Sequence, residues 1–261
     1  MPICKLLGGV QRDKVRAYGS TLMPYTPQEA AEEALRWKEQ GFSAVKMGWG
    51  GFELPQSECV KLVEATRNAI GDDMDMMLDI GFIPSGDFNV TAASRLLLIN
   101  EIREFKPYWI EEAVYPDDYE GYKMLVESTD VRIAGGENET TRYGFKQLIE
   151  VCKLDILQPD ITRCGGLTEA KRIGAMATAH NTTVIPHAWS SGIVIAASLH
   201  FIATQSNSNL LEYCVWDTPI RKEMLKQDFK LRDGYVDVPM GPGLGIEIDD
   251  EAIQKYRCDI I

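Results

Sequence analysis

The stretch DVRIAGGENE, Asp130 to Glu139, ends a short apolar run with two glycines and a carboxylate. Its β-branched residues and its length predict a buried strand, which places Glu137 at the strand end. A buried carboxylate costs free energy unless a cation or hydrogen-bond donors neutralise it. The fold must therefore supply Glu137 with a partner.

Similar apolar runs alternate with amphipathic segments along the whole chain. Strands are predicted at 15–20, 44–48, 74–80, 108–112, 131–137, 155–160, 183–188 and 210–214. Helices are predicted at 26–41, 57–71, 89–105, 119–129, 141–152, 167–181 and 192–206. Eight strands that alternate with seven helices indicate a parallel sheet. The strand count and regular alternation favour a closed TIM-type (β/α)7β barrel over an open α/β sheet, and a length of 261 residues matches such a barrel.

The pattern divides the chain into three parts. Residues 1–14 are interpreted as a linker, residues 15–216 as the barrel, and residues 217–261 as a C-terminal tail. The tail contains DGYVDVPMGPGLGIEID (233–249), which is rich in glycine and proline. This composition predicts turns and a strand that fold back on the barrel, followed by a short terminal helix.

Composition narrows the classes of partner. A formal net charge of −12 argues against a nucleic-acid-binding surface. The six cysteines are scattered without a CxxC pair, which is typical of reduced thiols in a cytoplasmic protein. The longest apolar stretch, 192–203, is too short to span a membrane. We therefore expect a small-molecule ligand, with no nucleic acid and no membrane.

Acidic residues gather where the predicted strands end, and in such barrels the active site lies at those ends. Asp79 ends the third strand, Glu111 and Glu112 end the fourth, and Glu137 ends the fifth. Acids from three adjacent strands would repel one another unless a divalent cation lay between them. Ligands that are all oxygen suit Mg²⁺. The alternative is that each acid is a solvated loop residue.

Four further polar residues are predicted at the same end of the barrel. Asp160 and His187 end neighbouring strands, and a carboxylate beside a histidine makes a general acid–base pair. The alternative is a structural histidine at the rim. Lys46 is interpreted either as a base or substrate ligand, or as simple charge balance. Glu212 is interpreted either as a substrate ligand or as a salt-bridged rim residue.

At these residues the chain resembles the enolase superfamily, and within it the mandelate racemase-like group. The matching pieces run in the family order over nearly the whole chain: LLGG, AVKMG, MMLDI, WIEE, GGENE, LQPDITRCGGLTEA, IPHAWSSG, LLEY and PMGPGLGIEID. The resemblance implies Mg²⁺ bound by Asp79, Glu111 and Glu137. It also implies an Asp160–His187 acid–base dyad, with Lys46 and Glu212 as catalytic residues. The chemistry implied is abstraction of the proton α to a carboxylate through an enediolate.

Two departures from the family pattern bear on function. Gly48 stands where the family's Lys-x-Lys motif has its second lysine, which weakens a two-base racemisation. Members of the family usually carry an N-terminal capping domain, and the sequence begins near the point where that domain normally ends. We therefore expect a barrel without its own lid, whose exposed surface favours a homo-oligomer.

Three functions remain open at this point. The first is a Mg²⁺-dependent dehydratase of a sugar acid, an aldonate or aldarate, which forms a 2-keto-3-deoxy acid. The second is a cycloisomerase or epimerase that uses Lys46 as a second acid–base group. The third is a catalytically silent barrel.

Overall fold

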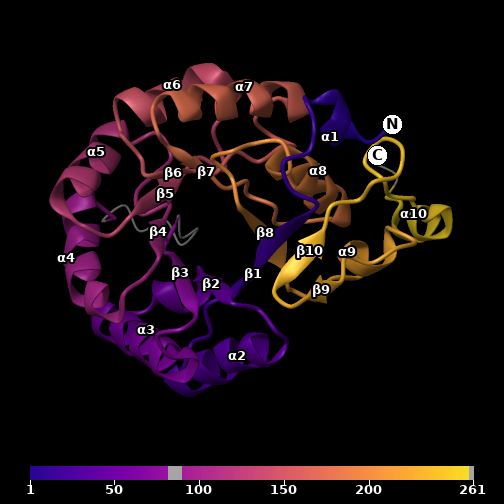
Figure 1. The fold of residues 1–261 in the computed structure, drawn as a ribbon. Helices are drawn as coiled ribbons and strands as arrows, with labels where there is room; N and C mark the ends of the chain where they lie inside the picture. Colours follow the sequence, from indigo (N-terminus) through magenta and orange to yellow (C-terminus); the bar gives the residue numbers. More distant parts are fainter. Residues whose placement is uncertain (82–89, 259–261) are drawn as a thin grey trace.

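A computed structural model describes residues 1–81 and 90–258 as a barrel of parallel strands surrounded by helices (Figure 1). The barrel strands are β1 (Lys14–Leu22), β2 (Ala44–Gly48), β3 (Asp75–Asp79), β4 (Trp109–Glu111), β5 (Ile133–Gly135), β6 (Ile156–Leu157), β7 (Thr183–Val184) and β8 (Leu210–Cys214). The surrounding helices are α2 (Pro27–Glu39), α3 (Gln56–Ile70), α4 (Ala92–Ile102), α5 (Tyr119–Ser128), α6 (Thr141–Glu150), α7 (Gly166–Ala179) and α8 (Gly192–Ile202).

The strands follow one another in sequence order around the barrel. β1 to β7 form consecutive parallel ladders, and β8 pairs in parallel with β1. Next to β7, the Val184 N–H donates to the Asn207 carbonyl just before β8. This order confirms the predicted TIM-type barrel.

Two of the predicted strands have the predicted bounds, and three end two or more residues earlier than predicted. β2 and β8 match 44–48 and 210–214. β5, β6 and β7 end at Gly135, Leu157 and Val184, so the prediction that Glu137, Asp160 and His187 lie within strands is wrong. All three residues lie in the loops that follow their strands.

Helix caps explain where several helices begin and end. The Thr26 side chain accepts from the Glu29 N–H, and proline follows it at the first helical position of α2. α3 ends at Ile70, and the residue that caps it, Gly71, has a φ of 73°. Among the described residues, no helix combines the length and apolar character that crossing a membrane requires.

Two hydrophobic clusters fill the molecule. The larger one lies between the strands and the helices. The smaller one fills the barrel interior and includes Tyr18, Met77 and Trp109, each with no exposed surface. Tyr18 and Trp109 pack edge to face, with ring centroids 5.5 Å apart. This interior layer lies directly beneath the polar residues at the strand ends.

The C-terminal tail returns to the first strand. β9 (Leu231–Arg232) and β10 (Tyr235–Asp237) form a hairpin, and β10 pairs antiparallel with Lys14–Arg16 of β1. The helix α10 (Asp250–Tyr256) follows. Short helical segments complete the description: α1 (Ile3–Leu6), η1 (Gly50–Glu53), η2 (Arg103–Phe105) and α9 (Pro219–Glu223).

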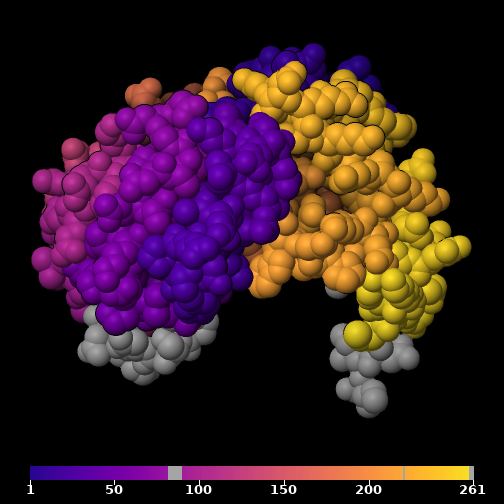
Figure 2. All heavy atoms as spheres, turned by 90° about the horizontal axis from the view of Figure 1, so that it is seen from below, coloured from indigo at the N-terminus to yellow at the C-terminus, as the bar shows by residue number. Residues whose placement is uncertain are grey.

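The position of an eighth barrel helix is taken by α9, which has only five residues. The surface is consequently hollowed between α2 and the segment 213–231, and Figure 2 shows this groove between the indigo and orange surfaces. None of the acids Asp79, Glu111 and Glu137 lines this groove.

Candidate active site at the carboxyl ends of the strands

A cavity of about 400 Å³ opens at the carboxyl ends of the strands. Four of the predicted site residues line it, namely Lys46, Asp79, Glu137 and His187. Trp49 and Trp189 also line it. The barrel therefore brings residues from distant positions of the chain to one opening.

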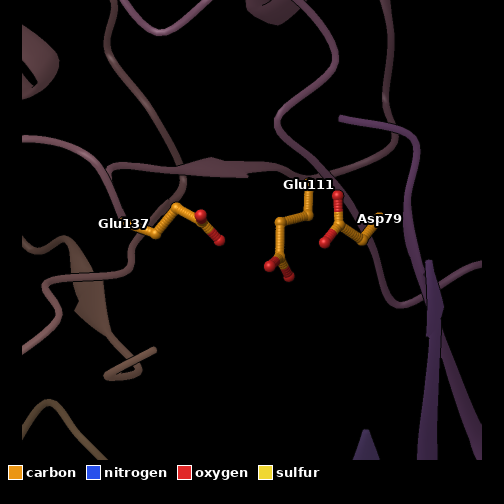
Figure 3. Close-up of side chains that lie close together, drawn as sticks. All are labelled: Asp79, Glu111 and Glu137. Carbon is orange, nitrogen blue, oxygen red and sulfur yellow. The ribbon is translucent and has the colours of Figure 1, made fainter. Parts of the chain in front are cut away.

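Asp79, Glu111 and Glu137 form an all-oxygen cluster. One ligand atom from each lies within 4.8 Å of the others, and the three carboxylates face a common space in Figure 3. Burial and the charge of Glu111 raise the pKa of Asp79 well above its usual range. Three carboxylates this close repel one another, and a cation between them would relieve the repulsion. Their oxygen atoms therefore fit a hard divalent cation such as Mg²⁺.

Glu111 is the most enclosed of the three acids. It ends β4 and has no exposed surface. One carboxylate oxygen, Oε2, accepts from Trp109 Nε1 at 2.9 Å and from Gln158 Nε2 at 2.7 Å. The other oxygen, Oε1, accepts from the Lys46 ammonium.

Lys46 is surrounded by carboxylates rather than by solvent. It pairs with Glu111, with Glu212 at 2.8 Å and with Asp79 at 3.9 Å. Burial alone would lower the pKa of Lys46, but Glu111 and Glu212 together raise it well above its usual range. The ammonium therefore stays charged at neutral pH.

Glu212 contacts both Lys46 and the loop that carries His187 and Ala188. Its Oε1 accepts from Ser20 Oγ at 2.7 Å, and its Oε2 accepts from the Ala188 N–H at 2.6 Å. Burial opposes ionisation, but Lys46 and His187 lower the pKa of Glu212 to about 2. Glu212 therefore stays ionised beneath the loop that carries His187.

His187 is held between two carboxylates. Its Nδ1 lies 2.8 Å from Asp160 Oδ2, and its Nε2 lies 3.3 Å from Glu137 Oε2. Asp160 is fixed in turn, because its Oδ1 accepts from both the N–H and the hydroxyl of Thr162. Burial alone would lower the pKa of His187, but Glu212, Asp160 and Glu137 raise it to about 9. Asp160 and His187 are thus in direct contact, and Nε2 points toward the acid cluster.

The outer edge of the cavity is more open. Arg163 approaches Glu137 Oε1 at 3.4 Å and Asn138 Oδ1 at 3.2 Å. Trp189 packs on Trp216, with ring centroids 5.9 Å apart. Arg163 and Trp216 were not among the residues selected from the sequence.

Sequence reasoning also missed Ser20, Trp109 and Gln158. Trp109 lies two residues before Glu111 on the same strand, so the alternation of a strand places both on one face. That signal was present in the sequence. Gln158 contacts Glu111 across 47 positions, and no spacing indicates this contact.

Gly48 leaves no room for a longer side chain. It lies opposite Asp79 in the ladder between β2 and β3. A Cβ atom at this position would lie 2.6 Å from Asp79 Cβ, closer than side chains approach in proteins. Where the family pattern has its second lysine, Asp79 therefore packs closely against the backbone of β2.

Comparison with known proteins agrees with this geometry. The family model described as enolase C-terminal domain-like matches residues 29–252. The chain belongs to the enolase superfamily. This confirms the resemblance inferred from the motifs.

Within the enolase superfamily, the chain is similar to enzymes that act on sugar acids. It is 33% identical to the D-galactarolactone cycloisomerase of Agrobacterium fabrum, over 98% of this chain and 68% of that protein. It is 34% identical to the D-galactonate dehydratase of Cronobacter sakazakii, over 97% of this chain and 67% of that protein.

A solved structure supports the same relationship. The 3,6-anhydro-D-galactonate cycloisomerase from Zobellia galactanivorans superposes with a TM-score of 0.87 at 36% identity. The match covers 98% of this chain and 69% of that one. The chain thus spans about two thirds of the length of these enolase superfamily relatives.

Proposed function

We propose that this barrel is the catalytic part of a Mg²⁺-dependent sugar-acid dehydratase. The substrate would be an aldonate or aldarate, and the product a 2-keto-3-deoxy acid. The observation that carries the proposal is the position of His187. Its Nε2 faces the acid cluster while Nδ1 is fixed by Asp160.

In the proposed reaction, Asp79, Glu111 and Glu137 would hold Mg²⁺. Bound there, Mg²⁺ would supply positive charge that stabilises an enediolate formed from the substrate carboxylate. Mg²⁺ at Glu137 would offset one of the carboxylate charges that raise the pKa of His187 and so favour its neutral form. Neutral His187 Nε2 then takes the proton α to the substrate carboxylate. The imidazolium then returns the proton to the β-hydroxyl as it leaves as water, so the atoms balance and one residue serves both steps.

Lys46 and Glu212, which lie beneath His187 and the acid cluster, contribute charge and position the loop that carries the base. Lys46 keeps its proton because three carboxylates face it, so it contributes charge rather than acting as a base. Glu212 accepts from the Ala188 N–H, next to His187 in the chain, and so helps to fix the loop that carries the base. Asp160 stabilises the imidazolium formed at the first step.

The second candidate is a cycloisomerase or epimerase. It is supported by the similarity to two cycloisomerases. The charge environment of Lys46 argues against its use as a second acid–base group. Epimerisation in D₂O would exchange the α proton without forming a keto acid, whereas dehydration forms one.

Product analysis tests the proposal. The purified chain is incubated with Mg²⁺ and a panel of pentonic, hexonic and aldaric acids, and α-keto acid is assayed. We expect His187→Asn and Glu137→Gln to lower the rate by about 10² to 10⁴, as loss of a general acid–base group or a metal ligand does. His180→Asn is the matched control, because His180 is exposed at the end of α7.

Each outcome decides between the candidates. A keto acid lost in both site variants and kept in the control supports the dehydratase. α-Proton exchange without a keto acid supports the epimerase or cycloisomerase. Neither product, in a chain that binds Mg²⁺, supports a catalytically silent barrel and overturns the proposal for this chain.

A further inference from the structure

Glu111 is held from inside the barrel by two uncharged donors. Trp109 Nε1 and Gln158 Nε2 both donate to its Oε2, at 2.9 and 2.7 Å. Glu137, at the open side of the same acid cluster, contacts His187 and the half-exposed Arg163 instead. The two acids are therefore supported in different ways.

The Trp109 donor is fixed by packing. Trp109 precedes Glu111 by two residues on β4, so both side chains point into the barrel. Its indole has no exposed surface and is packed edge to face against Tyr18 and Tyr108, at centroid distances of 5.5 and 5.6 Å. Rotating the indole away from Glu111 would require the interior layer to repack.

The Gln158 donor comes from a different strand. Gln158 follows β6, is 1% exposed, and its N–H donates to the Gly135 carbonyl of β5. Trp109 on β4 and Gln158 beyond β6 thus approach one oxygen of Glu111 from two sides. With Oε2 occupied twice, the plane of the carboxylate is set, and Oε1, which accepts from the Lys46 ammonium, keeps its second lone pair for a metal cation.

We propose that Trp109 and Gln158 are positioning residues that orient Glu111 for Mg²⁺. Loss of a hydrogen-bond partner behind a metal ligand commonly weakens metal affinity about 10- to 100-fold. This inference rests on the proposed metal site and is independent of which sugar acid is the substrate. A purely structural role for the two donors would change stability without changing metal affinity.

Metal binding by the whole chain tests the inference. Trp109→Phe and Gln158→Met remove one donor each while keeping similar volume. Binding of Mg²⁺ and Mn²⁺ is measured by calorimetry, and the bound Mn²⁺ is followed by electron paramagnetic resonance. We expect each variant to bind about 10- to 100-fold more weakly, with an altered Mn²⁺ spectrum.

The chain offers matched controls for both substitutions. Trp37 Nε1 donates to Glu33 Oε1 at 2.9 Å on α2, so Trp37→Phe removes the same kind of bond away from the cavity. Gln205 is a buried glutamine whose Nε2 donates to Thr204 Oγ1, so Gln205→Met is its counterpart. Both controls should bind metal within about twofold of the wild type, because neither residue contacts a proposed ligand.

The outcomes separate the inference from the metal site itself. If the folded wild type binds neither ion, the proposed metal site fails. If the wild type binds but Trp109→Phe and Gln158→Met bind equally well, only the positioning role fails. If Trp37→Phe and Gln205→Met weaken metal binding as much as the site variants do, the effect is a general structural one and the positioning role fails. Should Trp109→Phe not fold, Gln158→Met alone decides.

Discussion

The floor and the rim of the cavity are stabilised differently. The floor, defined as Lys46, Glu111 and Glu212 with their donors, is enclosed, since these three side chains are at most 4% exposed. The rim, defined as Glu137, His187, Arg163, Trp49 and Trp216, is more open, with Arg163 and Trp216 nearly half exposed. The floor charges are paired with one another inside the protein, whereas the rim keeps a carboxylate and a histidine that face the cavity.

This difference separates stability from reactivity within one site. A buried charge that loses its partner is expensive, so floor residues are coupled to folding. Rim residues contact groups that a metal or a substrate can replace. Loss of a charged side chain from the floor should therefore act first on stability, and loss of a rim side chain first on binding and turnover.

The largest effect is expected from Lys46→Met. This change leaves Glu111 and Glu212 buried without their cation, and loss of one partner from a buried pair costs about 3–5 kcal/mol. Urea unfolding in the presence of a chelator measures it. Lys146→Met is the control, since Lys146 pairs with Glu150 on the exposed face of α6 and should change stability by about 0.5 kcal/mol or less. If Lys46→Met lowers the free energy of unfolding as little as Lys146→Met does, the floor is not coupled to folding as argued.

pH should affect the rim more than the floor. The folded-state pKa of His187 is raised from 6.5 to about 9, so protonated His187 stabilises the metal-free fold. That contribution is fully present below about pH 6.5 and is lost as pH rises through about 9, roughly 3 kcal/mol in all.

The measurement is the difference in unfolding free energy between the wild type and His187→Asn, with chelator, from about pH 6 to about pH 9.5. We expect the difference to shrink as pH rises. The floor should contribute little to this dependence, because the pKa of Glu212 is about 2 and that of Lys46 is well above its usual range. A difference that stays constant over this range would argue against the contacts of His187.

Added Mg²⁺ should stabilise the chain through the acid cluster. A ligand at a hundred times its dissociation constant adds about 2.7 kcal/mol. Glu137→Gln should remove most of this gain while changing metal-free stability much less than Lys46→Met. Thermal unfolding with and without Mg²⁺ measures both, and an equal gain in Glu137→Gln would exclude Glu137 as a ligand.

The smallest of these effects is expected for Gly48→Ala. The added Cβ would lie 2.6 Å from Asp79 Cβ, and overpacking of this kind costs about 1–3 kcal/mol. Gly19→Ala is the control, because the atoms nearest to its added Cβ lie at 3.6 Å. Denaturant unfolding measures both variants. Equal stability would show that β2 can shift away from Asp79, and a lysine at position 48 would then be sterically possible.

Much of the fold could be predicted because local patterns and tertiary structure agree. The Thr26–Pro27 cap and the Gly71 terminus follow from short-range chemistry. The ends of β6 and β7 were overestimated because burial continues after pairing stops. Pro159 and Pro186 have no N–H to donate to a ladder, so the sheet ends before these prolines although the chain remains buried.

The candidate site was predicted in outline, from the acids and His187 at the ends of successive strands. Its supporting contacts were not, because they join strands that are not consecutive in the sequence. Gln158 reaches Glu111 across β5, and Ser20 reaches Glu212 across the seam between β1 and β8. Contacts of this kind depend on how the strands come together in the closed barrel, and local sequence patterns do not indicate this.

The seam between β1 and β8 has a consequence for how the chain is made. Ser20 and Glu212 are 192 positions apart, yet they share a hydrogen bond, and Lys46 meets Glu212 there as well. During translation Asp79, Glu111 and Glu137 emerge before Glu212 does. A nascent chain that ends before β8 therefore carries Lys46 without one of its counter-charges. Contacts between residues so far apart in the sequence form slowly. The pairing of β8 with β1 completes the floor of the cavity. Until that pairing forms, the chain exposes its barrel interior.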